Sequence, residues 1–344
     1  SGSQAMLKVL TLGDLPELDM QLDAPVRTKC QKLPGSVQRE HKLLSYSGVN
    51  LLFGCPRKYQ LAKAVPYAKE NTVHTAFGSA FGAGVQTYLV TGSKDYAIVA
   101  AASAWHMGLF DSDAKSNKSL ATCVLWLEKW IHSYGAHLLT EYKVFEVEGK
   151  PAIELAGCIT LGNGYSYRMF VDAVLQDRES GVLLVLEIKT TGSVVDPVTY
   201  HMSDQGTGYG VLVDALAKKY NLPSSFSVAY MVLESKTGDF AYFPFVKSAE
   251  ERVRWIAQQC AIADTIETIY NKFPIWPTRG NHCVSYGRAC QYAGSCTQEY
   301  LIPPDFGTYL PKEETYDFVC SVDEALNTQF TFDLRENREW LQHD

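Results

Sequence analysis

The chain has 344 residues, of which 46% are hydrophobic and 20% are charged, and its formal net charge is −7 at pH 7. This composition is ample for a full hydrophobic core, and the lack of a long uninterrupted apolar run argues against a membrane-spanning protein. The nine cysteines are an odd number, which argues against a simple disulfide framework and favours a reducing cytoplasm.

The first part of the chain is expected to be irregular before a helical region begins. Residues 1–44 contain scattered prolines and charges and are predicted as an N-terminal arm, whose first five residues read as an expression scar. Pro56 suits the first turn of a helix that follows Cys55. Apolar residues at helical spacing then predict a helical region over 76–135, and strands are expected within 142–159.

A predicted β-hairpin carries the most informative residues of the chain. Two apolar runs, 169–175 and 182–188, are separated by a polar segment that ends in glycine. Because side chains alternate along a strand, Glu187 and Lys189 should lie on one side of the second strand, with Ile188 on the other. An acid within a buried strand needs a partner, and either a metal ion or the Lys189 ammonium would serve.

Asp172 on the first strand and Glu187 on the second suit hydrolysis of a phosphodiester. Two carboxylates bind a hard divalent cation such as Mg²⁺ or Mn²⁺, and the Ile188 carbonyl can add a further oxygen ligand. The cation would lower the pKa of a bound water, and Lys189 would orient that water or stabilise developing negative charge. The alternative is an ordinary hairpin in which Glu187 and Lys189 form a solvated ion pair.

The segment after the hairpin predicts a helix on which Gln205 and Tyr209 lie one turn apart and share a face. Gly206 and Gly208 weaken the start of that helix. A second hairpin is predicted from residues 226–233 and 240–246, followed by a long helix over 248–270.

Four cysteines have the ligand count of a metal or cluster site, although they are far apart in the sequence. Cys55 precedes the hairpin, and Cys283, Cys290 and Cys296 follow it in a cysteine-containing region over 273–300. Four thiolates suit tetrahedral zinc or an iron–sulfur cluster, and the residues alone favour zinc or reduced, buried thiols. Most of the remaining cysteines are predicted to be small buried hydrophobic residues, and 301–344 is predicted as a C-terminal tail.

The order of these motifs resembles that of the PD-(D/E)XK nucleases, in particular the RecB-like branch that includes AddB, CRISPR-associated exonucleases and many phage exonucleases. The resemblance covers about residues 55–296 and implies an α/β nuclease domain over 45–300, with a mixed central sheet flanked by helices. It implies that Gln205 and Tyr209 position a DNA strand or a water near the metal. It also implies that the four cysteines hold a [4Fe–4S] cluster, with Zn²⁺ as the alternative.

One position departs from the pattern of that branch. RecB-like members usually carry a metal-binding histidine in a Gly-x-x-x-His motif, and Gly82 stands where this histidine would fall. Gln86, one turn later, lies where other members often have an acidic group. His74 lies close upstream and is expected to be a surface or packed residue rather than a ligand. The resemblance therefore implies a site of two acids and one lysine and does not extend to a second metal ion.

The basic residues expected to contact DNA phosphates lie beside the cysteines. They are Arg57, Lys58, Arg279 and Arg288. The negative net charge does not exclude DNA binding, because the local field near the substrate matters more than the total charge. For each residue taken singly, an ordinary solvated charge is an equally good interpretation.

The resemblance implies a metal-dependent DNA exonuclease of phage or mobile-element recombination or repair, acting on double-stranded ends or on single strands in the cytoplasm. A recombination protein is expected as a partner, and the chain is expected to form a homo-oligomer. No interaction with a membrane is expected. Three alternatives stay open: an endonuclease of the same superfamily, a catalytically inactive DNA-binding or assembly protein, and an enzyme that acts on RNA.

Overall fold

The computed structural model describes residues 31–32, 42–64, 72–105, 115, 117–161, 164–193, 196–224, 227–273, 275–285, 287–293, 296 and 315–325. Most of the predicted N-terminal arm and C-terminal tail therefore lies outside the described residues, as does Cys30. Within the described residues, no helix has the length and apolar character needed to cross a membrane.

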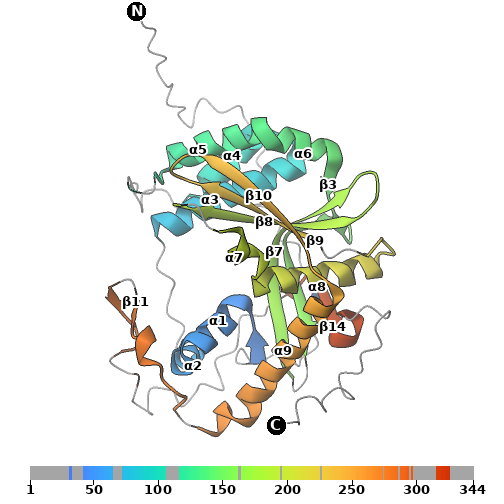
Figure 1. The fold of residues 1–344 in the computed structure, drawn as a ribbon. Coiled ribbons are helices and arrows are strands. Elements are labelled where there is room, and N and C mark those ends of the chain that lie inside the picture. Colours follow the sequence, from blue (N-terminus) through green and yellow to red (C-terminus); the bar gives the residue numbers. More distant parts are fainter. Residues whose placement is uncertain are drawn as a thin grey trace, which may run out of the picture.

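A central mixed sheet of eight strands runs through the molecule (Figure 1). Its main path is β10-β9-β8-β7-β6-β14, and β2 and β3 pair with opposite ends of β7. The middle strands β6, β7 and β8 are antiparallel, whereas β9 joins β8 in parallel and β10 then pairs antiparallel with β9. The strands are β2 (Leu43–Leu44), β3 (Tyr142–Val144), β6 (Ile153–Thr160), β7 (Ser166–Asp177), β8 (Leu183–Thr191), β9 (Ser227–Glu234), β10 (Asp239–Val246) and β14 (Phe318–Ser321).

Helices cover both faces of this sheet, which confirms the predicted mixed α/β architecture. One face packs against α3 to α5, whose buried side chains form one core with those of β7, β8 and β9. The other face packs against α1, α2, α8 and α9 in a second core. The helices are α1 (Tyr46–Gly54), α2 (Pro56–Ala64), α3 (Val73–Thr91), α4 (Lys94–Ala104), α5 (Leu120–Trp130), α6 (Ala136–Glu141), α7 (Pro197–His201), α8 (Asp204–Lys219), α9 (Ala249–Thr268) and α10 (Val322–Ala325).

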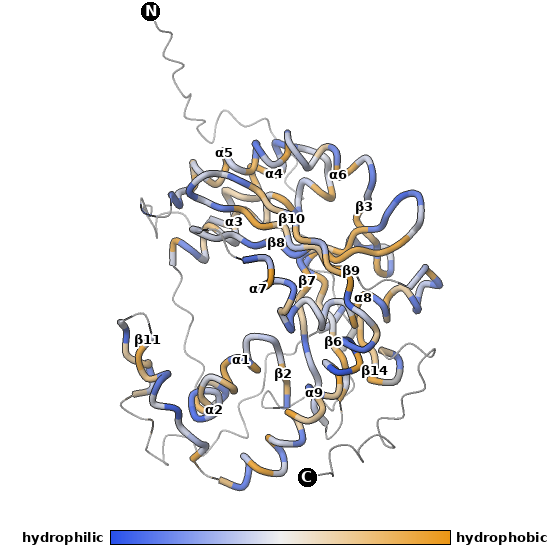
Figure 2. The backbone as a smooth tube through the Cα atoms, viewed as in Figure 1, coloured by the Kyte–Doolittle hydropathy of each residue, from blue (hydrophilic) through white to orange (hydrophobic). Residues whose placement is uncertain are grey.

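Short elements complete the chain between these layers. A π-helical segment, Ile131–Gly135, continues α5 into α6, and the 3₁₀ segments are Tyr270–Lys272 and Gly280–His282. Figure 2 shows hydrophobic stretches concentrated in the central strands and hydrophilic residues along much of the connecting loops. The remaining strands form small two-stranded pairs: β1 (Gln31–Lys32) with β13 (Thr315–Tyr316), β4 (Glu146–Val147) with β5 (Lys150–Pro151), and β11 (Val284–Ser285) with β12 (Arg288–Ala289).

The predicted hairpin is present as β7 and β8, and residues between Asp177 and Gly181 form its turn. Asp177 Oδ1 accepts hydrogen bonds from the backbone N–H groups of Glu179, at 3.0 Å, and Ser180, at 2.6 Å. Gly181 follows with φ 75°, a left-handed conformation that glycine adopts without steric cost. The local sequence therefore sets the register of the two strands that carry the predicted acids.

Part of the predicted tail belongs to the sheet. β14 pairs in parallel with β6, with Phe318 opposite Gly157, and the Ala156 N–H donates to Asp317 Oδ2 at 2.8 Å. This strand was not predicted from the sequence, because four residues next to a charged segment give a weak strand signal. The sheet therefore includes residues from well beyond the last predicted cysteine ligand.

Candidate active site

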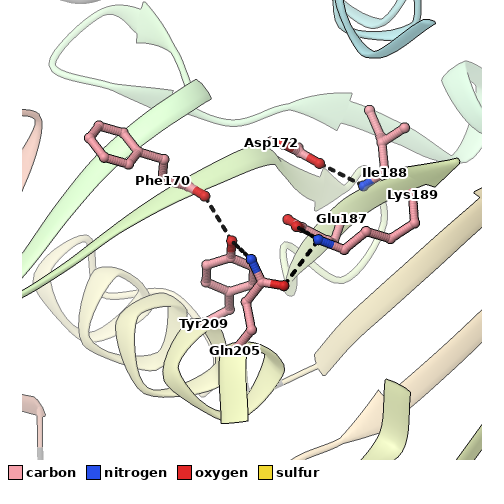
Figure 3. Close-up of polar contacts among 7 residues, drawn as sticks. All are labelled: Phe170, Asp172, Glu187, Ile188, Lys189, Gln205 and Tyr209. Atoms are coloured by element: carbon pink, nitrogen blue, oxygen red, sulfur yellow. Dashed lines mark hydrogen bonds and ion pairs between the residues drawn. The ribbon is translucent and has the colours of Figure 1, made fainter. Parts of the chain in front are cut away.

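The predicted acids lie where β7 and β8 separate. The two strands are paired from Ala173 opposite Leu186 to Gln176 opposite Leu183. Beyond these pairs β8 continues beside β9, whereas the other half of β7 runs beside β6. Asp172 and Glu187 are the next residues along this register, so their carboxylates enter the fork between the diverging strands (Figure 3).

Where the pairing of β7 and β8 ends, the Asp172 side chain makes the next hydrogen bond between the two strands. Its Oδ2 accepts a hydrogen bond of 2.6 Å from the Ile188 backbone N–H, in place of a strand carbonyl. This bond fixes Asp172 against the peptide that follows Glu187. The Ile188 carbonyl, predicted as a metal ligand, stays a prediction.

Glu187 and Lys189 lie on the same side of β8, as the alternation of strand side chains predicts. The Lys189 Nζ donates to Glu187 Oε1 at 2.6 Å and to Gln205 Oε1 at 3.0 Å. Glu187 is only 3% exposed, which makes the solvated ion pair of the alternative interpretation a poor description. Its second oxygen, Oε2, is buried and has no hydrogen-bond partner among the described residues. A buried carboxylate oxygen without a donor is suited to a cation.

The first two turns of α8 supply Gln205 and Tyr209 to the same site, as Figure 3 shows. Gln205 Nε2 donates to the Tyr209 hydroxyl at 2.9 Å, and that hydroxyl donates to the Phe170 carbonyl at 2.8 Å. A continuous chain of hydrogen bonds thus runs from β8 through α8 to β7. Both side chains are oriented by the sheet rather than by the helix alone.

The glycines that weaken α8 are explained by close packing. A Cβ added at Gly206 would lie 2.8 Å from the Tyr230 hydroxyl, and one at Gly208 would lie 2.7 Å from the Trp255 ring. The loss of helix propensity at these positions therefore allows α8 to approach β9 and α9. This brings Gln205 within reach of Lys189.

The fork is an unfavourable place for negative charge. Burial raises the pKa of Asp172 well above its ordinary value, and the neighbouring Glu187 carboxylate raises it further. Burial also raises the pKa of Glu187, although Lys189 opposes that shift. Burial lowers the pKa of Lys189, but the charge and the hydrogen bond of Glu187, together with the charge of Asp172, raise it above its ordinary value. The site therefore holds acids that need a cation to be stable in their charged form.

One face of α3 lies along the fork. A Cβ added at Gly78 would lie 3.4 Å from Thr190 Oγ1 of β8, and Gln86, two turns later, donates to the Asp172 carbonyl at 3.2 Å. Gly82 lies between them on the same helix face, and a Cβ added there would meet nothing within 4 Å. The position at which the RecB-like branch carries a histidine thus has open space. His74 is exposed on the first turn of α3.

Replacing Gly82 with alanine is expected to raise the free energy of unfolding by up to about 1 kcal/mol, because alanine favours the helix and the added methyl group has room. Chemical denaturation measures the change. Gly84→Ala is the matched control on the same helix: its Cβ would lie 2.4 Å from Leu127 Cδ2, so this variant should be destabilised. A loss of stability in Gly82→Ala would contradict the open space described here.

Glu154 is a residue of this site that was not predicted from the sequence. It lies on β6, and its Oε1 accepts a hydrogen bond of 2.7 Å from Gln86 Nε2. Its carboxylate is close enough to raise the pKa of both Asp172 and Glu187. The only sequence signal is an acid within the apolar run 152–159, and its proximity to Asp172 depends on a strand register that the sequence does not reveal.

The structure brings the four predicted cluster cysteines into one neighbourhood. Burial raises the pKa of the Cys296 thiol, and Cys55, Cys283 and Cys290 raise it further, whereas Arg57 lowers it. Four thiols in one neighbourhood fit the donor set of an iron–sulfur cluster or of zinc. In the part of the chain described, however, no three His, Cys, Asp or Glu side chains have the spacing of metal ligands.

The other cysteines are largely packing residues. Cys123, Cys158 and Cys320 are buried, as predicted, and burial raises the pKa of the first two to about 12. Cys260 is half-buried. No disulfide joins cysteines within the described residues.

The predicted DNA contacts differ in their accessibility. Arg57 is 0% exposed, and its guanidinium donates to the Cys296 carbonyl at 2.8 Å and to Gln60 Oε1 at 2.6 Å. Its role is to hold the cysteine segment against α2, so a DNA contact is not expected there. Lys58 is half-buried, and Arg279 and Arg288 are exposed.

A comparison with known protein families agrees with this geometry. A family model described as the PD-(D/E)XK nuclease superfamily matches residues 43–297. Among solved structures, one titled "Crystal structure of SSO0001" aligns with 78% of this chain and 100% of its own, at 15% identity and a TM-score of 0.24. No curated protein matches the chain significantly.

Proposed function

The chain belongs to the PD-(D/E)XK nuclease superfamily, and on that premise we propose that it is a metal-dependent DNA exonuclease. One observation carries the proposal. Asp172 and Glu187 extend from two diverging strands into one fork, and Lys189 is bonded to Glu187 beside them. Two neighbouring carboxylates can hold a divalent cation that assists hydrolysis of a phosphodiester, and the adjacent lysine can stabilise the negative charge that develops.

Asp172 and Glu187 would hold the divalent cation, Mg²⁺ or Mn²⁺, with the Ile188 carbonyl as a further ligand. When bound, the cation supplies a water of lowered pKa and offsets charge on the phosphate. Lys189, which is held by Glu187 and Gln205, keeps a protonated donor beside the cation site, where it orients the attacking water or stabilises negative charge.

Gln205 and Tyr209 would position the DNA strand. Burial raises the pKa of Tyr209 well above its ordinary value, so its hydroxyl stays protonated and remains a hydrogen-bond donor. Its bond to the Phe170 carbonyl fixes the ring, and the Gln205 amide is fixed from both ends. A Gln205 amide that Tyr209 holds in place can align a substrate with little loss of entropy on binding.

The test is digestion of end-labelled linear DNA by the purified protein with Mg²⁺, with Mn²⁺ and with a chelator, beside Glu187→Ala. We expect release of nucleotides from the ends with either metal, and none with the chelator or with the variant. Closed-circular DNA distinguishes the alternatives: its digestion would identify an endonuclease. Binding without digestion of any DNA would identify a catalytically inactive assembly protein.

We also propose that Cys55, Cys283, Cys290 and Cys296 hold a [4Fe–4S] cluster. Their convergence around Cys296 supports this proposal, and so does the buried Arg57 that ties α2 to the last of them. Anaerobic purification should give a coloured protein with the visible absorbance of such a cluster. A colourless protein that contains stoichiometric zinc would contradict the cluster and would indicate a structural zinc site.

A role in phage or mobile-element recombination, in the cytoplasm and with a partner protein or a second copy of the chain, completes the proposal. It rests on the resemblance of the motifs to the RecB-like branch.

A further inference from the structure

Glu154 has a backbone conformation that is unusual inside a strand. Its φ is 49°, in the left-handed region that L-residues with a Cβ adopt at an energetic cost. The other described residues of this kind, apart from glycines, are Asn117, Glu148 and Asn221, and all three lie in turns. Such strain in a packed strand persists only where the surrounding structure enforces it, and it is frequent at functional sites.

The register places Glu154 directly opposite Asp172. The β6–β7 ladder pairs Ile153 with Ala173 and Leu155 with Val171, and it omits the pair between them. Gln86, which is 3% exposed, bridges this gap: its Nε2 donates to Glu154 Oε1 and to the Asp172 carbonyl. One buried amide thus holds the Glu154 side chain and the Asp172 backbone together.

Folding alone does not explain a charged side chain at this position. A glutamine at 154 would accept the same hydrogen bond from Gln86 without adding a third negative charge near Asp172 and Glu187. Among the described residues, Lys189 is the only positive residue with a hydrogen bond to any of these three acids, and it bonds Glu187 alone. The buried, unpartnered Oε2 of Glu187 points to the ligand that would compensate the excess charge, namely a cation.

We propose that Glu154, held by Gln86, raises the affinity of the Asp172–Glu187 site for a divalent cation without ligating the cation itself. This inference rests on the proposed metal-dependent function. A negative charge a few ångströms from a bound cation, in a poorly solvated site, favours the cation and disfavours the metal-free state. Glu154 also orients Gln86, and through it the Asp172 backbone, so it is a positioning residue rather than a catalytic one.

Titration of the full chain with Mn²⁺ alone, followed by calorimetry or by the paramagnetic resonance of free Mn²⁺, tests the proposal without DNA. Glu154→Gln keeps the shape and the hydrogen bond of the side chain, and we expect it to weaken Mn²⁺ binding about 10- to 100-fold. Without metal, its unfolding temperature should equal or exceed that of the wild type. If the negative charge of Glu154 itself stabilised the fold, that temperature would fall instead.

Glu148→Gln is the matched control, because Glu148 is also an acid with positive φ, but it lies in a turn and pairs with Lys219. It should bind Mn²⁺ like the wild type. Glu154→Gly, which suits a positive φ, gives a second variant with the charge removed and the backbone relaxed. If wild type and Glu154→Gln bind Mn²⁺ equally, this inference alone is overturned. If the wild type binds no Mn²⁺, the proposed function is overturned with it.

Discussion

Replacing Lys189 with methionine is expected to lower the rate of DNA cleavage at least about 100-fold, the usual effect of removing one preorganised donor from a transition state. Methionine preserves the length and the packing of the side chain but removes the ammonium bonded to Glu187 and Gln205. Glu187 then loses the group that opposes its raised pKa, so it is a poorer cation ligand at neutral pH. Single-turnover cleavage of end-labelled DNA at saturating Mg²⁺ measures the effect.

Lys94→Met is the control for this variant. Lys94 pairs with Glu128 on the surface, where both side chains are largely exposed, and such pairs contribute little. Its cleavage rate should match that of the wild type. If Lys189→Met kept more than a tenth of the wild-type rate, Lys189 would not have the proposed role.

In a chelator, the free energy of unfolding of the wild type is expected to fall as the pH rises above 3.8, the ordinary pKa of an aspartate. The pKa of Asp172 is raised in the folded state, so at pH values between the ordinary and the raised pKa the folded protein binds more protons than the unfolded chain. Stability therefore decreases through that window, by about 1.4 kcal/mol for each pH unit that separates the two pKa values. Asp172→Asn should remove most of this decrease and be the more stable protein at pH 8.

Denaturant unfolding at several pH values, with and without Mg²⁺, measures this effect. Mg²⁺ should stabilise the wild type at pH 8 by about 2.7 kcal/mol at a hundred times its Kd and should have much less effect on Asp172→Asn. Asp177→Asn, on the same strand, is a control of opposite sign. Hydrogen bonds from Ser180 lower the pKa of Asp177, so this residue contributes stability above its ordinary pKa and loses it as the pH falls. If the free energy of unfolding changed with pH in the same way in the wild type and in Asp172→Asn, the charged form of Asp172 would not be destabilised by its surroundings.

The local sequence was sufficient to predict the hairpin and the acids that it carries. Asp177 and Gly181 close its turn, and the alternation along β8 places Glu187 and Lys189 on one side. The family match over residues 43–297 supports the superfamily, whereas the roles of Gln205 and of the cysteines remain predictions.

The residues that the sequence did not reveal depend on contacts between distant segments. Glu154 meets Asp172 through the β6–β7 register, and Arg57 meets Cys296 only once the two ends of the nuclease region come together. Neither contact has a local pattern. In the same way, the exposure of a basic residue depends on what packs over it, which is why Arg57 was wrongly expected to contact a phosphate.

The position of β14 sets the order in which the sheet can be completed. The Ala156–Asp317 bond joins residues 161 positions apart. The edge of β6 that pairs with β14 therefore stays unpaired until the segment that contains Asp317 has left the ribosome. Unpaired strand edges promote association between incompletely folded chains, and contacts of such long separation form slowly. The strand that carries Glu154 thus depends on a segment that is synthesised late, and production of the protein should benefit from slow translation or low temperature.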